Sequence, residues 1–529
     1  MRQILKFKSV FAVGVVLSLA GCQLPEELAD VLPQDDQIED EQPVDADGRD
    51  PVLSALDLQL ADLITRFNLN AHPQRDLPSI QDALPQLGKK LFFTKSLGGQ
   101  FDSACVTCHH PSLGGADGLS LSVGVDANLP DLLGPGREHK DGLPLVPRNA
   151  PTIFNVGLWD VGLFHDSRVE SLNVVPGTNG IIGDIRTPDS DFGVADILSG
   201  NNLASAQAAF PVTSVEEMRG NVFEAGSDNN VLRDHLAARI GDYAEGENAL
   251  SENGWLTEFQ TALGSNASAE ELISFENIAH ALGEYERSMV FTDHPWQQYM
   301  DGNTDALNEN EKAGAVLFFT APNEGGAGCA ACHNGQLFSD EQHHVVAFPQ
   351  IGPGKGDGVN ADDDFGRERE TGVTTDRYRF RTGSLLNLNV TAPYGHSGSL
   401  ETLEDVVRHY INPDRSVDNY FGDDRRQNEI CRLDQFDQLA DCEDIYPNAQ
   451  ENSELAVNKL QQEQNAGISR LARGIRLNNT EVDQLVLFLK ALTDPCVENR
   501  DCLSDWIPSP DDAADEHQLN AVNRNGAVL

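Results

Sequence analysis

Apolar residues recur every three or four positions along several segments of the chain. One such segment has apolar residues at 53, 56, 60, 64 and 67, which share one face of a helix. A second follows Ser268-x-x-Glu271, a motif typical of a helix start, with apolar residues at 272, 275, 279 and 282. A third opens at Thr480-x-x-Asp483 and has apolar residues at 482, 485, 489 and 492 before Pro495. We expect a helix in each.

Alternation of apolar and polar residues, the pattern of a half-buried strand, is scarce. Long segments rich in Gly, Pro and Asp occupy residues 124–147 and 352–375. The second has aspartates at 357, 362, 363 and 364 but lacks the glycine at the sixth position of an EF-hand, so we expect a solvated loop. The predicted fold class is all-α with long loops.

The first residues have the pattern of a targeting segment. Basic residues at 2, 6 and 8 precede an apolar run over 10–20, which is shorter than the roughly 20 residues of a spanning helix. The run ends in Leu-Ala-Gly-Cys22, which resembles a bacterial lipobox; the alternative is a plain cleaved signal with an incidental cysteine. We predict a lipoprotein signal peptide at 1–21, a lipid on Cys22 and an acidic tether over 22–50. Gln23 after the cysteine favours the outer membrane, facing the periplasm.

The charge of the chain limits its partners. It has 37 basic and 84 acidic residues among 529, a net charge of -47. Nucleic acid and anionic bilayers would be repelled, so the lipid is the only membrane contact that we expect. A basic protein partner would be attracted, although adaptation to high salt also produces such a surface.

The motif C-x-x-C-H occurs twice, at 105–109 and 329–333. Two thiols at this spacing reach both vinyl groups on one haem edge, and the following His points at the iron. A four-cysteine zinc site would need about 15–20 residues between its pairs, and a thioredoxin-like pair needs no His. The predicted attachment residues of two c-type haems are Cys105, Cys108, His109, Cys329, Cys332 and His333.

Four further cysteines stand at 431, 442, 496 and 502. In an oxidising compartment they predict two disulfides, although free buried thiols are the alternative. The short-range pairs Cys431 with Cys442 and Cys496 with Cys502 are the simplest of three connectivities.

The surroundings of the two motifs are repeated. Residues 88–94 read GKKLFFT before the first motif, and residues 314–320 read GAVLFFT before the second. After the motifs, Asn155 precedes His165 by ten residues and Asn387 precedes His396 by nine. We therefore predict two haem domains related by internal duplication, at 51–300 and 301–506, followed by a polar tail at 507–529.

Together with the two motifs, four further segments resemble the bacterial diheme cytochrome c peroxidase family, MauG-like branch. These segments are residues 147–152 (PRNAPT), 164–168 (FHDSR), 217–218 (EM) and 391–396 (TAPYGH). The resemblance covers about residues 53–495. It implies two cytochrome c-like helical domains with a calcium ion between the haems. Asn149 and the carbonyls of Thr391 and Pro393 match the calcium ligands, and family members are often homodimers.

Three departures from the family pattern bear on function. Family peroxidases with an inhibited resting state place a His in Ser-x-Gly-His-Gly to cap the N-terminal haem, and here Val125 occupies that position. Valine cannot bind iron, so the N-terminal haem should be five-coordinate and open. His139 is a fallback ligand, although a loop His is more often a solvated surface residue.

The C-terminal haem of a family peroxidase has an axial Met, but no Met lies beyond the second motif. Counting from His396, the family position falls on Tyr410, which shares a helical stripe with apolar residues at 403, 406 and 407. His409 lies about 100° away on that helix. We expect Tyr410 as the distal ligand, with His409 and a packing tyrosine as alternatives.

The family's Phe-Trp-Asp-Gly-Arg becomes FHDSR over 164–168, so His165 replaces the Trp that relays charge between the haems. The match implies catalytic roles for His165 and Arg168. Trp159 is a substitute relay only if the fold turns it inward. Glu217 matches the family's distal glutamate, which would move a proton between the peroxide oxygens, with Glu216 as the alternative.

The resemblance implies an oxidoreductase that reduces hydrogen peroxide with electrons from a periplasmic donor such as a small cytochrome c. Two alternatives stay open. One is a MauG-like enzyme that oxidatively modifies Trp or Tyr of a protein substrate, and the other is a non-catalytic diheme electron carrier.

Overall fold

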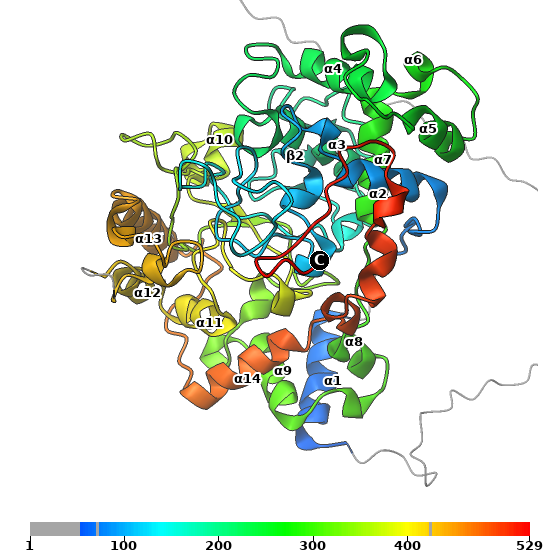
Figure 1. Cartoon of the computed structure of the whole chain (residues 1–529). Helices are drawn as coiled ribbons and strands as arrows, with labels where there is room; N and C mark the ends of the chain where they lie inside the picture. Colours follow the sequence, from blue (N-terminus) through cyan, green and yellow to red (C-terminus); the bar gives the residue numbers. More distant parts are fainter. Residues whose placement is uncertain (1–52, 70–72, 423–425) are drawn as a thin grey trace, which may run out of the picture. The chain divides into compact units, whose positions relative to one another are not determined.

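The structure is a computed structural model, and it describes residues 53–69, 73–422 and 426–529. Helices predominate in these residues, and strands are few and short (Figure 1). The prediction of a mostly helical fold is therefore confirmed. The predicted signal peptide, Cys22 and the acidic tether lie outside the described residues.

The helices before residue 290 are α1 (Ala55–Phe67), α2 (Ala83–Phe93), α3 (Leu203–Ala208), α4 (Asn229–Gly241), α5 (Trp255–Leu263), α6 (Ala269–Leu272) and α7 (Phe275–Arg287). Those that follow are α8 (Pro295–Met300), α9 (Glu309–Phe319), α10 (Glu368–Thr371), α11 (Leu403–Ile411), α12 (Pro413–Tyr420), α13 (Ala449–Ala466) and α14 (Asn479–Lys490). None of the helices in the described part of the chain has the length and apolar character needed to span a membrane.

The strands form two small antiparallel sheets. The first has the order β1 (Gly162–Leu163), β2 (Val169–Ser171) and β3 (Ile185–Arg186), with Leu163 opposite Val169 and Ser171 opposite Ile185. The second pairs β4 (His343–His344) with β5 (Phe380–Arg381). The turn between β1 and β2 contains residues 164–168, so the first sheet positions His165 and Arg168.

Two helix pairs make up the main scaffold. Helix α2 packs on α7, and α9 packs on α14. Each pair meets at a glycine: a Cβ at Gly88 would overlap the carbonyl oxygen of Ala281, and a Cβ at Gly314 would overlap that of Gln484. Only glycine, which has no Cβ, allows the two backbones to approach this closely.

After the motifs, two asparagines show the same similarity between the first and second halves of the chain. Asn155 and Asn387 both have left-handed backbones, with φ of 62° and 65°. Both side-chain amides donate to the carbonyl of Phe291, each at 3.1 Å. The loops that follow the two motifs therefore meet at one backbone carbonyl.

The ends of the described chain pack on the half that is distant in sequence. Helix α1 belongs to the hydrophobic cluster built around α9 and α14, and it lies beside α9 in Figure 1. Leu503, Leu519 and Ala521 belong to the cluster around α2 and α7. The segment predicted as a polar tail thus has buried apolar residues. Residues 53–529 form one compact unit, and a domain boundary near residue 300 stays a prediction.

The predicted helix after Ser268 is interrupted. Ser268 and Glu271 form the expected capping box at the start of α6, but α6 ends at Leu272. Ser274 then accepts a hydrogen bond from the Asn277 amide at 3.2 Å and begins α7. The prediction of one continuous helix was wrong because a second N-cap inside the apolar pattern starts a new helix.

The start of α14 was also predicted two residues too late. Asn478, rather than Thr480, is the N-cap, and its side chain accepts from the Glu481 amide at 3.1 Å. The Glu481 carboxylate in turn accepts from the Asn478 amide at 2.7 Å. This reciprocal pair satisfies two backbone groups that Thr480 would leave unpaired.

The segment 352–375 is a solvated loop in part, with Val359 97% exposed, but two of its predicted surface aspartates are buried. Asp363 and Asp364 are 1% and 3% exposed. Arg148 binds Asp364 through two nitrogens, at 2.6 and 2.8 Å, and it also binds Asp166. A buried guanidinium needs such partners, and the segment therefore folds inward to supply them.

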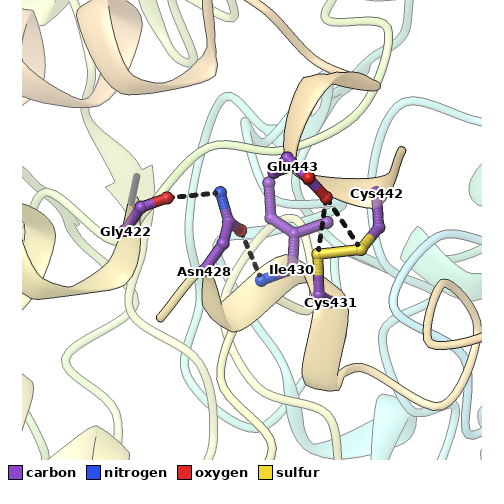
Figure 2. Close-up of a disulfide and its surroundings, with 6 residues drawn as sticks. All are labelled: Gly422, Asn428, Ile430, Cys431, Cys442 and Glu443. Atoms are coloured by element: carbon purple, nitrogen blue, oxygen red, sulfur yellow. Dashed lines mark hydrogen bonds between the residues drawn. A yellow bond between two sulfur atoms is a disulfide. The ribbon is translucent and has the colours of Figure 1, made fainter. Parts of the chain in front are cut away.

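Among the described residues, the four cysteines outside the C-x-x-C-H motifs form the two short-range disulfides, Cys431–Cys442 and Cys496–Cys502. Figure 2 shows the first of these, between short turns, with Asn428 donating to the carbonyl of Gly422 at 3.4 Å. Both bonds fit an oxidising compartment.

Candidate functional site

The first motif begins with a short 3-10 turn, Cys105–Thr107, and places Cys105 and Cys108 beside each other with free thiols. The Nδ1 of His109 lies 3.2 Å from the carbonyl oxygen of Gly115. A hydrogen bond from Nδ1 to this carbonyl fixes the ring and leaves Nε2 free to bind a metal.

The second motif repeats this arrangement. The turn Cys329–Ala331 presents Cys329 and Cys332 with free thiols, and the Nδ1 of His333 lies 3.0 Å from the carbonyl oxygen of Phe338. Burial lowers the pKa of His109 to about 4 and also lowers the pKa of His333. Both imidazoles are therefore neutral at pH 7, as a metal ligand must be.

A cavity of about 350 Å³ lies beside the second motif and reaches His109 of the first. Its lining includes His109, Cys329, Cys332 and His333, together with many apolar side chains. This volume is typical of sites for organic cofactors. The residues fit a covalently held haem, because the motif thiols stay free in a chain whose other described cysteines are bonded.

Helix α11 presents the predicted stripe to this cavity. Leu403, Val406, Val407 and Tyr410 all line it, as their helical spacing predicts. The Tyr410 ring centroid lies 6.4 Å from that of His333, with the rings nearly perpendicular. Burial raises the pKa of Tyr410, so its phenol is neutral without a cation beside it.

His409 is held away from this space. It is fully buried and stacks on Phe348 with ring centroids 4.6 Å apart. Its Nε2 lies 2.8 Å from the carbonyl oxygen of Val346. Its neighbour Tyr410 is the residue of this pair that lines the cavity.

Glu217 lies on a π-helical turn, Val215–Arg219, which Ser214 begins by accepting from the Glu217 amide at 3.3 Å. Burial raises the pKa of Glu217, while Arg168 and Lys355 lower it. Burial also raises the pKa of the Cys108 thiol, and Glu217 is among the charges that add to the rise. Glu217 therefore belongs to the first motif's surroundings, near two cations.

Glu216, the alternative to Glu217, is engaged locally, since its carboxylate accepts from the Ser214 hydroxyl at 3.2 Å. Its backbone carbonyl accepts from the amide of Val125 at 3.3 Å. Val125 is 2% exposed. The valine that replaces the family's capping His thus runs alongside the glutamate turn.

His139 is not the solvated residue that its loop position predicts. It is 4% exposed, and its Nδ1 accepts from the Asp141 amide at 3.1 Å. The cause lies two residues earlier, where Arg137 donates to the carbonyls of Val123 and Gly124 at 2.6 and 2.8 Å. These bonds hold the loop inward.

His165 lines the cavity from the turn between β1 and β2, with its Nε2 3.0 Å from the carbonyl oxygen of Asn149. Burial and the nearby Arg148 lower the pKa of His165 to about 3. Its own carbonyl accepts from the Arg381 amide at 2.8 Å. The imidazole is therefore neutral and is held by Asn149, while the backbone carbonyl of His165 makes the hydrogen bond to the other half.

Arg168 follows in the same turn. Its guanidinium carbon lies 3.5 Å from the centroid of the Phe164 ring, and its Nη1 lies 3.3 Å from Asp166. Asp166 is shared with Arg148. The stacking and the ion pair fix Arg168, whose charge acts on Glu217.

Trp159 is turned inward: it is 6% exposed and lines the cavity. The guanidinium carbon of Arg381 lies 3.7 Å from its ring centroid, and the Arg381 Nε donates to the carbonyl of Phe164 at 2.9 Å. A fixed cation on the indole face makes it harder to remove an electron from the ring.

Asn149, Thr391 and Pro393, the residues that match the calcium ligands, line the same cavity. The Asn149 amide nitrogen donates to the carbonyl of Leu119 at 2.8 Å. The cavity lining therefore includes Asn149 from the first half and the neighbouring residues Thr391 and Pro393 from the second.

Glu286 was missed by the sequence reasoning. It is 5% exposed, lines the cavity from α7, and burial alone raises its pKa to about 8. A signal was present in the sequence, because Glu286 falls four residues after Leu282 on the apolar stripe of that helix.

Comparison with known proteins agrees with this arrangement. Residues 82–305 match the family model described as di-haem cytochrome c peroxidase. The chain is 29% identical over 327 residues to the methylamine utilization protein MauG of Methylorubrum extorquens, covering 61% of this chain and 67% of that protein. It is 28% identical over 331 residues to the cytochrome c551 peroxidase of Pseudomonas aeruginosa, covering 62% and 71%.

Among solved structures, the chain is similar to a MauG-like protein associated with microbial copper homeostasis. The TM-score is 0.51 with 22% sequence identity, over 82% of this chain and 96% of that one. This likeness concerns the fold.

Proposed function

The chain belongs to the di-haem cytochrome c peroxidase family, and from this premise we propose that it reduces hydrogen peroxide to water with electrons from a periplasmic donor such as a small cytochrome c. It is an oxidoreductase that acts on peroxide. The observation that carries the proposal is Glu217, a carboxyl with a raised pKa beside a haem-attachment motif.

The family implies two haems. In our proposal Cys105 and Cys108 attach the first haem and His109 binds its iron, while Cys329, Cys332 and His333 do the same for the second. When bound, the haems supply iron that exchanges electrons with peroxide and holds oxidising equivalents.

Glu217 handles the protons. Its carboxylate would take a proton from one oxygen of peroxide and return it to the other oxygen, which would leave as water. Overall, one peroxide takes up two protons and two electrons and yields two waters. Arg168 supplies positive charge where negative charge develops on the oxygens. Val125, which cannot bind iron, leaves room for peroxide.

Tyr410 would be the residue that closes the second site by holding its iron through the phenol oxygen. This assignment is supported by its position on the cavity wall and by the hydrogen bond that occupies the His409 Nε2. A tyrosinate is a hard anionic donor that stabilises oxidised iron, whereas the usual Met favours reduced iron. The second site would therefore store oxidising equivalents.

Electron exchange between the sites would pass the region of His165, which hydrogen-bonds Asn149. Trp159 is the less suitable relay because Arg381 covers its ring. We further propose that the two halves arose by duplication, which is supported by the equivalent contacts of Gly88 with Gly314 and of Asn155 with Asn387.

A calcium ion held by Asn149, Thr391 and Pro393 is part of the proposal, as is periplasmic attachment to the outer membrane through a lipid on Cys22. Homodimer formation stays an analogy with the family. The net charge of -47 suits a basic donor protein.

A second candidate function is oxidation of Trp or Tyr in a partner protein. Val125 and Tyr410 favour it, because an open first site and an anionic ligand at the second both support a long-lived oxidised state. Steady-state peroxide consumption with reduced cytochrome c separates the two. Rapid turnover supports the peroxidase, whereas slow turnover with covalent change in a co-expressed partner supports the second function. A carrier would give no spectral response to peroxide.

A further inference from the structure

Glu286 is a buried acid that the proposed peroxide chemistry does not use. It lies on α7 and is 5% exposed, and its Oε2 has no hydrogen-bond partner among the described residues. Its carboxyl lines the cavity that also contains His109. A polar group in such a place costs stability unless it has a role or stays neutral.

The equivalent position in the other half has no acid. The Cβ atoms of Tyr285 and Phe488 make the same close approach to Gly88 and Gly314. Counting one residue onward in each helix pairs Glu286 with Leu489. Leu489 is 7% exposed and also lines the cavity. The acid is therefore specific to the first half at this shared position.

No charged neighbour compensates Glu286. Helix α7 packs on α2, α3, α4 and the turn Val156–Leu158. Helix α3 and the turn carry no charged residue. The basic residues on the buried sides of the other two are engaged elsewhere: Lys89 with the Asp505 carbonyl, Lys90 with Glu258, Arg233 with Asp189, and Arg239 with the Ser96 and Gly98 carbonyls.

The titratable groups that face Glu286 are the Cys105 thiol and the Tyr285 phenol, because each has its pKa raised first by burial and then by Glu286. Both groups are uncharged at neutral pH. Burial is the only cause of the raised pKa of Glu286, about 8, so the carboxyl is protonated at pH 7. Positive charge nearby would favour its ionised form.

We propose that Glu286 is a proton-loading residue of the first haem site. Its carboxyl releases one proton to solvent when that site loses one electron to an oxidant, and it takes up one proton when the electron returns. The oxidant is peroxide in the proposed reaction and a redox mediator in the test. This inference rests on the proposed haem attachment at Cys105 and Cys108.

The proton exchange would keep the net charge of a buried site constant while it is oxidised. Such compensation matters because a new charge in a low-dielectric interior is costly. Leu489 offers none, so the second site should gain its full charge on oxidation. Only the first site's reduction potential should then depend on this carboxyl.

The test is a redox titration of the haem-loaded protein over a pH series on both sides of neutrality, with the two irons followed separately by electron paramagnetic resonance. One proton released per electron changes the reduction equilibrium tenfold per pH unit, which is about 59 mV for a one-electron couple. We expect the first site's potential to fall with rising pH towards this slope, and Glu286→Gln to remove the slope. Leu489→Met, a matched change in the other half, should leave it intact.

A first-site potential that is independent of pH in the wild type would overturn the inference, and so would a slope that persists in Glu286→Gln. The wild-type measurement decides the question if that variant does not fold. Haem content is measured first: a wild-type chain without haem would overturn the proposed function, whereas a haem-loaded chain without the slope would overturn this inference alone.

Discussion

The two C-x-x-C-H regions share a scaffold and differ in the polar groups around it. In both, a glycine joins a helix pair and an asparagine in a left-handed conformation binds the carbonyl of Phe291. In both, a backbone carbonyl holds the Nδ1 of the motif's His. The backbone therefore holds the two motifs in matching surroundings.

The side chains then make the sites unequal. The first region has Glu217 and Glu286, both with raised pKa values. It also has Val125 at the position where family peroxidases with an inhibited resting state have a capping His. The second has Tyr410 and Leu489 at its cavity wall. The two motifs therefore share a backbone arrangement, and in our proposal the difference in reactivity comes from the two acids of the first region.

The largest expected effect is on peroxide chemistry. Glu217→Gln removes the proton carrier, so the rate of peroxide reduction should fall by about 10²–10⁴-fold. The matched control is Glu216→Gln, which changes the neighbouring carboxyl that Ser214 binds and should have a much smaller effect. Stopped-flow reaction with peroxide measures both, and equal losses would contradict the assignment to Glu217.

The shared scaffold predicts equal effects in the two halves. Gly88→Ala and Gly314→Ala each force a Cβ against the backbone of the partner helix, and each should lower the free energy of unfolding by about 3 kcal/mol. Gly383→Ala, where a Cβ meets nothing within 4 Å, should change it by about 0.5 kcal/mol or less. Chemical denaturation measures all three. A large loss of stability at only one of the helix glycines would contradict the claim that the two helix pairs pack in the same way.

The first region also predicts a dependence of stability on pH. The pKa of Glu286 is raised from 4.5 to about 8 on folding, so its contribution is complete below pH 4.5 and is lost as pH rises through 8. The slope is at most about 1.4 kcal/mol per pH unit. Unfolding midpoints across this range should decline less in Glu286→Gln than in wild type. Identical declines would argue against a protonated carboxyl.

At the second region, Tyr410→Phe should alter the low-spin ferric signal, which arises from one of the two irons. His409→Phe should leave that signal unchanged, because the His409 Nε2 binds the Val346 carbonyl. Electron paramagnetic resonance of both variants provides the measurement. A changed signal in His409→Phe alone would assign the ligand to that residue instead.

Local patterns in the sequence predicted the helical fold, the two motifs, the disulfide pairs and the cavity-lining stripe of α11, because each depends on residues close together in the chain. Contacts over long separations could not be predicted this way. The pairing of Arg148 with Asp364 spans more than two hundred residues, and it buries the middle of an acidic loop whose other residues are largely exposed. The packing of α1 on α9 has the same origin.

Competing local signals account for the errors in the helices. Ser274 and Asn478 are N-caps whose hydrogen bonds outweigh the apolar periodicity on either side. Glu286 was passed over because an acid on an apolar stripe breaks the pattern, and its meaning depends on neighbours that only the fold supplies. The unpartnered carboxyl became evident once α7 was placed against α2 and the cavity.

The most direct test of the account is electron paramagnetic resonance of the ferric, haem-loaded protein at rest. The account predicts one high-spin iron, bound by His109 and open on its other side, and one low-spin iron, bound by His333 and a second ligand. Two low-spin signals of equal intensity would contradict it, because both sites would then be closed to peroxide.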